Sequence, residues 1–557
     1  MTSQELIDRI KREFGEQVLE AREPAPKAVY FTIRPEAVVR IADYVSNEMD
    51  GRFLITAGTD ERPLPEGGFR VSHIFSFDKD QLYCTLQARV DGDKPAIDSI
   101  TPKVRGAYWA ERELYDAVGV ESRNHPDPRR LILADDWPRD VFPLRKDVPF
   151  DLHPDPDPEA RPQMAEPPEG ATVFPIGPFF PVLEEPAYFR VFVEGETVVG
   201  CDYRGFYNHR GIEKMGDSAL TYNQVPFIAE RICGICGFIH STCYCQAIEQ
   251  ATEIEVPIRA RYIRSIMLEL ERIHSHILWL GIAGHIIGFD TVLMQSWRIR
   301  EPVMWLCEKI SGNRKTYGMN LVGGVRRDIR KEDYDEILRV VGKVGQELGE
   351  VIDAIGGDTP LMMRLKGVGH IPVQDAREIC VTGPTARGSD RWIDARTDHP
   401  YAAYDEIGVE IKVHSECDVL ARTLVRLEET LEAVREIQKA IPEMPDGPIM
   451  AEVHEIPAGR EGVSVVEAPR GEAIHYVLTG DDNHVYRWRV RAPTYPNLQS
   501  VPVMIQGEQI ADVPICIGSL DPCFSCTERM EVVDAKTEEV KVYSQQELTE
   551  LSRSKRR

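Results

Sequence analysis

The chain has 557 residues, 42% of them hydrophobic, and a formal net charge of −25 at pH 7. That length exceeds what one hydrophobic core supports and predicts about two to four domains. The acidic balance argues against nucleic acid as a partner, because phosphates are bound by Lys and Arg. The longest apolar run, 277–289, contains a histidine and is too short for a membrane span. The charged N-terminus lacks the apolar core of a signal peptide, so we expect the twelve cysteines to be cytoplasmic thiols and metal ligands.

Residues 1–150 predict a small α+β domain. Three runs rich in β-branched and aromatic residues have the length of strands, and one charged run has helical spacing. The expected strands cover 52–59, 70–77 and 83–90, and the expected helix covers 111–120.

A proline-rich segment follows this domain. The sequence PDPDPEARPQMAEPPEG at 154–170 carries six prolines and five carboxylates. This composition favours an extended, solvated chain over helix or strand. We therefore expect a linker over 151–172.

The pattern after the linker is mainly helical. Apolar residues recur on one face over 259–280 and again over 420–434. Over 486–491, tyrosine, tryptophan and valine alternate with arginines after the turn sequence GDDN, which predicts a hairpin. We expect a large, mainly α-helical domain with a small β portion over 173–529.

Two Cys-x-x-Cys pairs are the strongest chemical signal. They are Cys233 with Cys236, and Cys523 with Cys526. Two cysteines at this spacing can bind one ion, and thiolates select Zn, Ni, Cu(I) or iron over Mg or Ca. Structural zinc is the main alternative, but zinc ribbons hold their two pairs within a few tens of residues. The wide separation here favours a centre buried inside a large domain.

The residues around both pairs resemble the two signature motifs of the large subunit of [NiFe] hydrogenases. The matching segments are Arg210–Glu213, Glu230–Cys236 with His240, and Asp521–Cys526. The 49 kDa quinone-module subunit of respiratory complex I is similar to this family but lacks the four metal-binding cysteines. Their presence therefore favours the hydrogenase.

The N-terminal region resembles the 30 kDa subunit of complex I. The segments that carry this second resemblance are Trp109–Glu113, Tyr115–Asp116, His125–Pro126, Arg129–Arg130 and Pro143–Lys146. A fusion of the two parts is typical of the energy-converting hydrogenases related to complex I, such as the large subunits of formate hydrogenlyase and hydrogenase-4.

The resemblance implies a Ni-Fe centre in which all four cysteines bind nickel. Cys236 and Cys526 would bridge to an iron carrying CO and cyanide, and Cys233 and Cys523 would be terminal ligands. A terminal thiolate remains basic, so Cys523 is the candidate proton acceptor. Glu213 matches the family's proton-relay glutamate; as an isolated residue it would be read as an exposed carboxylate.

Four further residues match the surroundings of the metal centre in this family. Pro469 and Arg470 lie in a loop that would place an arginine over the metals, and Thr494 would donate to a cyanide. His240 would donate to a bridging sulfur. The alternatives are a surface ion pair for Arg470, a strand residue for Thr494 and a satisfied core histidine for His240.

Other cysteines and histidines carry weaker signals. We expect Cys243 and Cys245 to be packing residues. The group His274, His276 and His285 is a weak candidate for a second metal, and core or interface positions are favoured. No glycine-rich nucleotide loop is present in the sequence.

The family also implies partners and maturation. A small subunit would carry a [4Fe–4S] cluster, and ferredoxin-like and membrane subunits would hold this chain at the cytoplasmic face of the membrane. An endopeptidase would remove 530–557 after Arg529, although Ser544–Glu547 offers a capping box for a retained helix. Two other functions stay open: a quinone-reducing subunit, and a zinc-stabilised assembly subunit without catalysis.

Overall fold

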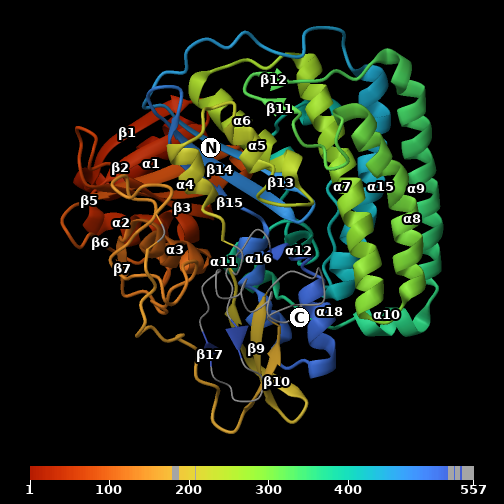
Figure 1. Ribbon diagram of the computed structural model, residues 1–557, viewed down its shortest axis with the longest axis horizontal. Helices are drawn as coiled ribbons and strands as arrows, with labels where there is room; N and C mark the ends of the chain where they lie inside the picture. Colours follow the sequence, from red (N-terminus) through yellow and green to blue (C-terminus); the bar gives the residue numbers. More distant parts are fainter. Residues whose placement is uncertain (153, 178–186, 207–208, 525–531, 534–539, 542–557) are drawn as a thin grey trace, which may run out of the picture.

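The computed structural model describes residues 1–557 except 153, 178–186, 207–208, 525–531, 534–539 and 542–557. An N-terminal sheet lies on one side of the molecule and a bundle of long helices on the other, with a second sheet between them (Figure 1). The mixed α and β composition agrees with the sequence. Among the described helices, none has the length and apolar character needed to cross a bilayer.

The N-terminal sheet has five strands in the order β1-β2-β5-β4-β3. Strands β2 and β5 run parallel, and the other neighbours in this sheet are antiparallel. The strands are β1 Val18–Ala25, β2 Ala28–Ile33, β3 Arg52–Asp60, β4 Phe69–Phe77 and β5 Leu82–Val90.

Three helices share the hydrophobic core of this sheet: α1 (Ser3–Phe14), α2 (Val38–Asp43) and α3 (Tyr108–Val118). Gly58 lets α3 approach β3, because a Cβ there would lie 2.5 Å from Leu114. The three predicted strands and the predicted helix are therefore present.

The helical bundle consists of α7 (Ile258–Ile286), α8 (Asp290–Ser311), α9 (Tyr334–Gly356) and α15 (Val419–Glu443). Each helix packs against two of the others (Figure 1). Both helices predicted from apolar periodicity, 259–280 and 420–434, are confirmed as parts of α7 and α15.

The central sheet has three antiparallel strands, β13 (Glu461–Ala468), β14 (Gly471–Thr479) and β15 (Val485–Arg491). The helix α6 (Gly237–Thr252) packs on β13 and β14. The predicted hairpin joins β14 to β15, and Asp482 and Asn483 have positive φ in its turn.

Arginine side chains connect β15 to the edge strand β3 of the N-terminal sheet. The Nε–H groups donate to three β3 carbonyls: Arg487 to Gly58 (2.8 Å), Arg489 to Thr56 (3.1 Å) and Arg491 to Leu54 (3.2 Å). We call this set the arginine ladder. It satisfies acceptors that an edge strand leaves without a neighbouring strand.

The smaller elements fill the space around these parts. The helices are α4 Ile212–Ser218, α5 Val225–Ala229, α10 Thr359–Leu365, α11 Val373–Ile379, α12 Gly383–Arg387, α13 Ala395–Asp398, α14 Tyr404–Ile407, α16 Thr494–Leu498, α17 Val501–Ile505 and α18 Val513–Gly518. The strands are β6 Ala96–Asp98, β7 Glu121–Arg123, β8 Thr172–Ile176, β9 Tyr188–Glu194, β10 Thr197–Arg204, β11 Asn320–Leu321, β12 Gly324–Val325, β16 Val532–Val533 and β17 Val540–Lys541.

The hydrophobic core of the N-terminal sheet also includes residues of β13 and β14, such as Val463 and Tyr476. The division into 1–150, 151–172, 173–529 and 530–557 therefore stays a prediction. The predicted capping box at 544–547 lies outside the described residues.

Candidate metal centre

Three of the four predicted cysteine ligands lie in the described part of the chain, and Cys526 lies outside it. Cys233 is in the loop after α5, Cys236 is the N-cap of α6, and Cys523 follows α18. The Sγ atoms of Cys233 and Cys523 are 3.2 Å apart. All three side chains are buried. The fold thus brings sulfurs from both ends of the larger region together.

The first pair is shaped by the start of α6. The backbone N–H groups of Ile235 and Cys236 point at Sγ of Cys233, at 3.4 and 3.3 Å. Gly237 allows this tight path, since a Cβ would lie 2.3 Å from the Tyr317 ring. N–H donors at a helix start stabilise a thiolate.

The donor set fits a soft metal. Hydrogen bonding with Cys233, followed by burial, raises the pKa of the Cys236 thiol well above its usual value. A bound cation would reverse this effect and keep the sulfurs ionised. Within the described residues, no group of three or more His, Cys, Asp or Glu forms a metal cluster by itself, and the predicted fourth ligand is not among them.

Arg470 occupies the turn between β13 and β14, next to Pro469. Its side chain is fully buried, which excludes the surface ion pair considered from the sequence. Its Nη2 donates to the Asp521 carboxylate (2.8 Å), its Nε to the Asp521 carbonyl (2.7 Å) and its Nη1 to Ser275 (3.0 Å). Burial lowers the pKa of Arg470, but Asp521 and the three cysteine sulfurs outweigh it and hold this pKa above its usual value.

Asp521 and Thr494 fix the second cysteine segment. Burial raises the pKa of Asp521 to about 6, although the charge of Arg470 opposes it. The Thr494 hydroxyl accepts the Cys523 backbone N–H at 3.2 Å. Thr494 begins α16, so the alternative of a strand residue is wrong. The sequence did not predict the contacts of Asp521 and Ser275.

His240 is a buried donor on α6. The Trp488 indole N–H donates to Nδ1 of His475 (3.1 Å), so His475 carries its hydrogen on Nε2 and donates it to Nδ1 of His240 (3.1 Å). His240 then carries its own hydrogen on Nε2, which has no partner among the described residues. Burial lowers the pKa of His240 to about 4, so the ring is neutral. The alternative of a satisfied core histidine is therefore correct for Nδ1 and wrong for Nε2 among the described residues.

Glu213 lies on α4 within a set of charged residues that we call the carboxylate cluster: Glu113, Glu213, Asp217, Arg487 and Arg489. Arg487 contacts Glu213 at 2.8 Å, and Arg489 and the Val490 N–H donate to it at 2.9 and 3.0 Å. Burial raises the pKa of Glu213, but the two guanidinium groups outweigh burial and lower it overall. Glu213 is 17% exposed, which contradicts a solvated surface carboxylate.

The N-terminal region contributes to this cluster. Both carboxylate oxygens of Glu113 on α3 accept from Arg489, each at 2.6 Å. A cavity of about 120 Å³ is lined by Glu113, Glu213 and Ile232, the residue before Cys233. Arg210 donates to the Ile232 carbonyl at 3.1 Å and so ties the start of α4 to the first cysteine pair.

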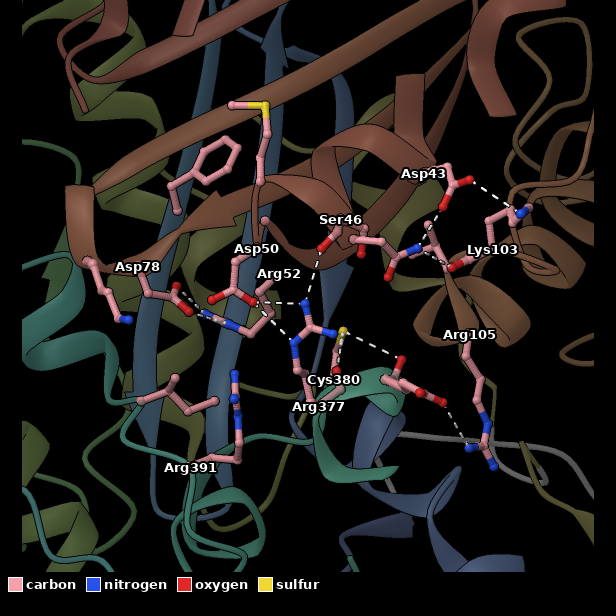
Figure 2. Close-up of a pocket in the computed structure, with 18 of the residues that line it drawn as sticks. Asp43, Ser46, Asp50, Arg52, Asp78, Lys103, Arg105, Arg377, Cys380 and Arg391 are labelled. Atoms are coloured by element: carbon pink, nitrogen blue, oxygen red, sulfur yellow. Dashed lines mark hydrogen bonds and ion pairs between the residues drawn. The ribbon is translucent and has the colours of Figure 1, made fainter. Parts of the chain in front are cut away.

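A larger cavity of about 690 Å³ lies elsewhere, between the N-terminal region and the segment from Arg377 to Asp398. Figure 2 shows three of its basic side chains next to acidic partners: Arg377 with Asp50 (2.9 Å), Lys103 with Asp43 (3.4 Å) and Arg52 with Asp78 (2.7 Å). None of the candidate site residues lines it.

Four of the five weaker cysteine and histidine candidates are buried packing residues. Cys243 and Cys245 are buried in α6. His274 and His276 are buried in α7, and Nε2 of His276 lies 3.2 Å from a carboxylate of α15. His285, near the end of α7, is exposed. The three histidines therefore do not share one site.

Glu271 on α7 was not singled out from the sequence, although it supports the first cysteine pair. Its carboxylate accepts the Phe238 and Ile239 N–H groups at the start of α6, at 3.1 and 3.0 Å. Burial raises the pKa of Glu271 to about 8, and these two N–H groups oppose that rise. The residue carries no spacing signal, because its partners belong to another helix.

Comparisons with known families agree with this geometry. Residues 210–292 match the family described as nickel-dependent hydrogenase. Residues 287–461 and 452–529 match the 49 kDa subunit of respiratory-chain NADH dehydrogenase, and residues 31–154 match its 30 kDa subunit.

Formate hydrogenlyase subunit 5 of Escherichia coli (strain K12) is 39% identical over 528 residues, covering 94% of this chain and 92% of the relative. Hydrogenase-4 component G of the same strain is 39% identical over 547 residues, covering 98% and 96%. The chain belongs to the complex I-related nickel-dependent hydrogenases. The hydrogenase is an oxidoreductase acting on H₂, and its family supports a Ni-Fe centre.

The hydrogenase is also similar to a chain in the structure of membrane-bound sulfane sulfur reductase, an archaeal respiratory membrane complex. The TM-score is 0.62 at 27% identity, and the match covers 65% of this chain and 99% of that chain. Since that complex is named for a sulfur substrate, the shared fold does not decide the reaction.

Proposed function

We propose that Cys233, Cys236, Cys523 and Cys526 hold the Ni-Fe centre, with CO and cyanide on the iron, in a subunit that interconverts H₂ with protons and electrons. The observation that carries this proposal is the 3.2 Å approach of two buried sulfurs that lie 290 residues apart. When bound, the centre would supply the Lewis acid for heterolytic cleavage of H₂.

The surrounding residues have defined tasks in this proposal. Cys523 accepts a proton at Sγ, while Thr494 holds its backbone in place. Glu213 receives that proton and passes it outward. Arg470 places a permanent positive charge beside the sulfurs, and Nε2 of His240 offers a hydrogen bond to a sulfur.

The relatives support membrane-complex partners. We propose a formate hydrogenlyase-like assembly in which a small subunit carries the [4Fe–4S] cluster, and ferredoxin-like and membrane subunits hold this chain at the cytoplasmic face. A maturation endopeptidase would remove 530–557, so the mature chain would end at Arg529.

Metal analysis of this subunit separated from its iron–sulfur partners, and infrared spectroscopy of the purified complex, test the proposal. We expect nickel and iron in about equal amounts, bands of metal-bound CO and cyanide, and a chain mass ending at Arg529. Absence of metal would favour the quinone-reducing subunit, and zinc alone would favour the assembly subunit. Glu213→Gln should retain nickel and lose most H₂ oxidation; wild-type activity would refute the relay.

A further inference from the structure

Asp217 lies one helical turn after Glu213 on α4. Both carboxylates contact the same atom, Nη1 of Arg487, at 2.8 Å from Glu213 Oε2 and 3.4 Å from Asp217 Oδ2. The side chain of Asp217 is only 2% exposed. Two carboxyl groups therefore share one guanidinium in a buried space, which is the arrangement in which protonation of one group affects the other.

The two oxygens of Asp217 have different environments. Oδ1 accepts the Trp488 backbone N–H at 2.6 Å, which fixes the carboxyl group. Oδ2 lies 4.0 Å from Nζ of Lys146, a residue of the N-terminal region. Lys146 is 17% exposed and donates to the Tyr486 carbonyl. Asp217 thus connects the interior of the cluster with a side chain that reaches solvent.

The surroundings of Asp217 raise its pKa toward the neutral range, so this carboxyl group can both take up and release a proton. Burial raises the pKa of Asp217 to about 6; Lys146 and Arg487 oppose this, and the charge of Glu213 adds to it. Lys214, on the same helix, donates to the Arg145 carbonyl at 2.9 Å. Burial lowers the pKa of both lysines.

We propose that Asp217 takes the proton from Glu213 and passes it to solvent through Lys146. This proposal rests on the proposed relay role of Glu213. A proton that arrives at Glu213 moves to the ionised carboxylate of Asp217. Lys146 gives a proton from its ammonium group to solvent and takes the proton of Asp217 in its place, so one proton leaves and all three groups return to their starting forms.

The test measures H₂ oxidation by the purified complex with an artificial electron acceptor, in H₂O and D₂O, from about pH 5 to about pH 9. For Asp217→Asn we expect the rate of H₂ oxidation to fall roughly tenfold or more and its solvent isotope effect to increase. The decrease of the wild-type rate below about pH 6 should be absent in this variant. Asp217→Glu should recover much of the rate. Asp481→Asn, an exposed carboxylate of the hairpin turn, is the matched control and should equal wild type.

The outcomes separate the two proposals. If Glu213→Gln is inactive while Asp217→Asn keeps the wild-type rate and pH profile, the relay of Glu213 stands and the role of Asp217 is refuted. If Glu213→Gln is fully active, both proposals fail. If Asp217→Asn does not load nickel, Lys146→Gln decides: a slower rate with a larger isotope effect supports the route, and wild-type behaviour overturns it.

Discussion

Two members of the carboxylate cluster line a cavity that reaches Ile232, the residue before Cys233. The metal centre and the cluster are nevertheless built by different parts of the chain. The described residues around the sulfurs come from the larger, hydrogenase-like region. The carboxylate cluster takes Glu113 and the neighbouring Lys146 from the N-terminal region, which resembles the 30 kDa subunit. Among the residues that the structure describes, the N-terminal region therefore contributes to the carboxylate cluster and not to the surroundings of the cysteine sulfurs.

The difference also concerns charge. Around the sulfurs, one buried arginine and N–H groups compensate negative charge that a metal would share. In the carboxylate cluster, two arginines face three carboxyl groups. The first arrangement suits a fixed charge, and the second suits a change of protonation.

The largest effect is expected when a predicted cysteine ligand of the metal centre is replaced. Cys236→Ser should abolish nickel binding and activity, because a hydroxyl is a poor ligand for a soft metal. Nickel content of the purified complex measures this. Cys243, on the same helix, donates to the Ser464 carbonyl, and Cys243→Ser should retain nickel. Equal nickel in both variants would contradict the assignment of the ligands.

The sequence predicted the long helices and the hairpin well, because their periodicity is local. The specific motif spacing also singled out Cys233 and Cys523, whose sulfurs lie 3.2 Å apart, and their role as metal ligands stays a prediction. The sequence could not predict the arginine ladder, because alternation of arginines with apolar residues in β15 normally indicates a solvated face, whereas here that face meets β3.

Partners of the predicted residues were missed for a different reason, which is their distance along the sequence. The pairs Glu113–Arg489 and His240–His475 join segments that are hundreds of positions apart. Arg489 and His475, the partners of Glu113 and His240, carry no spacing signal. The packing of α6 on β14 brings the histidines together, and the packing of the N-terminal region against β15 brings Glu113 to Arg489.

A smaller effect is expected where the two regions meet. Glu113→Gln removes the charge that Arg489 shares with Glu213, so the pKa of Glu213 should fall further. Glu213 then stays ionised to lower pH and is a weaker proton acceptor. We expect several-fold slower H₂ oxidation, roughly tenfold at most, with the acidic limb shifted to lower pH and nickel unchanged. Glu121→Gln, exposed on β7, is the control. An identical pH profile in both variants would exclude an influence of Glu113 on proton transfer.

The smallest effect on activity is expected for Arg491, the residue of the arginine ladder that is not part of the carboxylate cluster. Arg491 donates to Leu54 and pairs with Glu472 at 2.6 Å, but it does not contact Glu213 in the described structure. Arg491→Met leaves Glu472 paired with Arg52, so we expect a loss of about 2 kcal/mol in the stability of the contact between the sheets.

Hydrogen exchange measures this loss. A change of about 2 kcal/mol corresponds to roughly 30-fold faster exchange of β3 and β15 amides, whereas Arg139→Met at an exposed position should leave exchange unchanged. If Arg491→Met instead lowers H₂ oxidation as strongly as Glu113→Gln, the ladder acts as one unit with the carboxylate cluster. The separation between the structural Arg491 and the arginines of β15 that contact Glu213 would then be wrong.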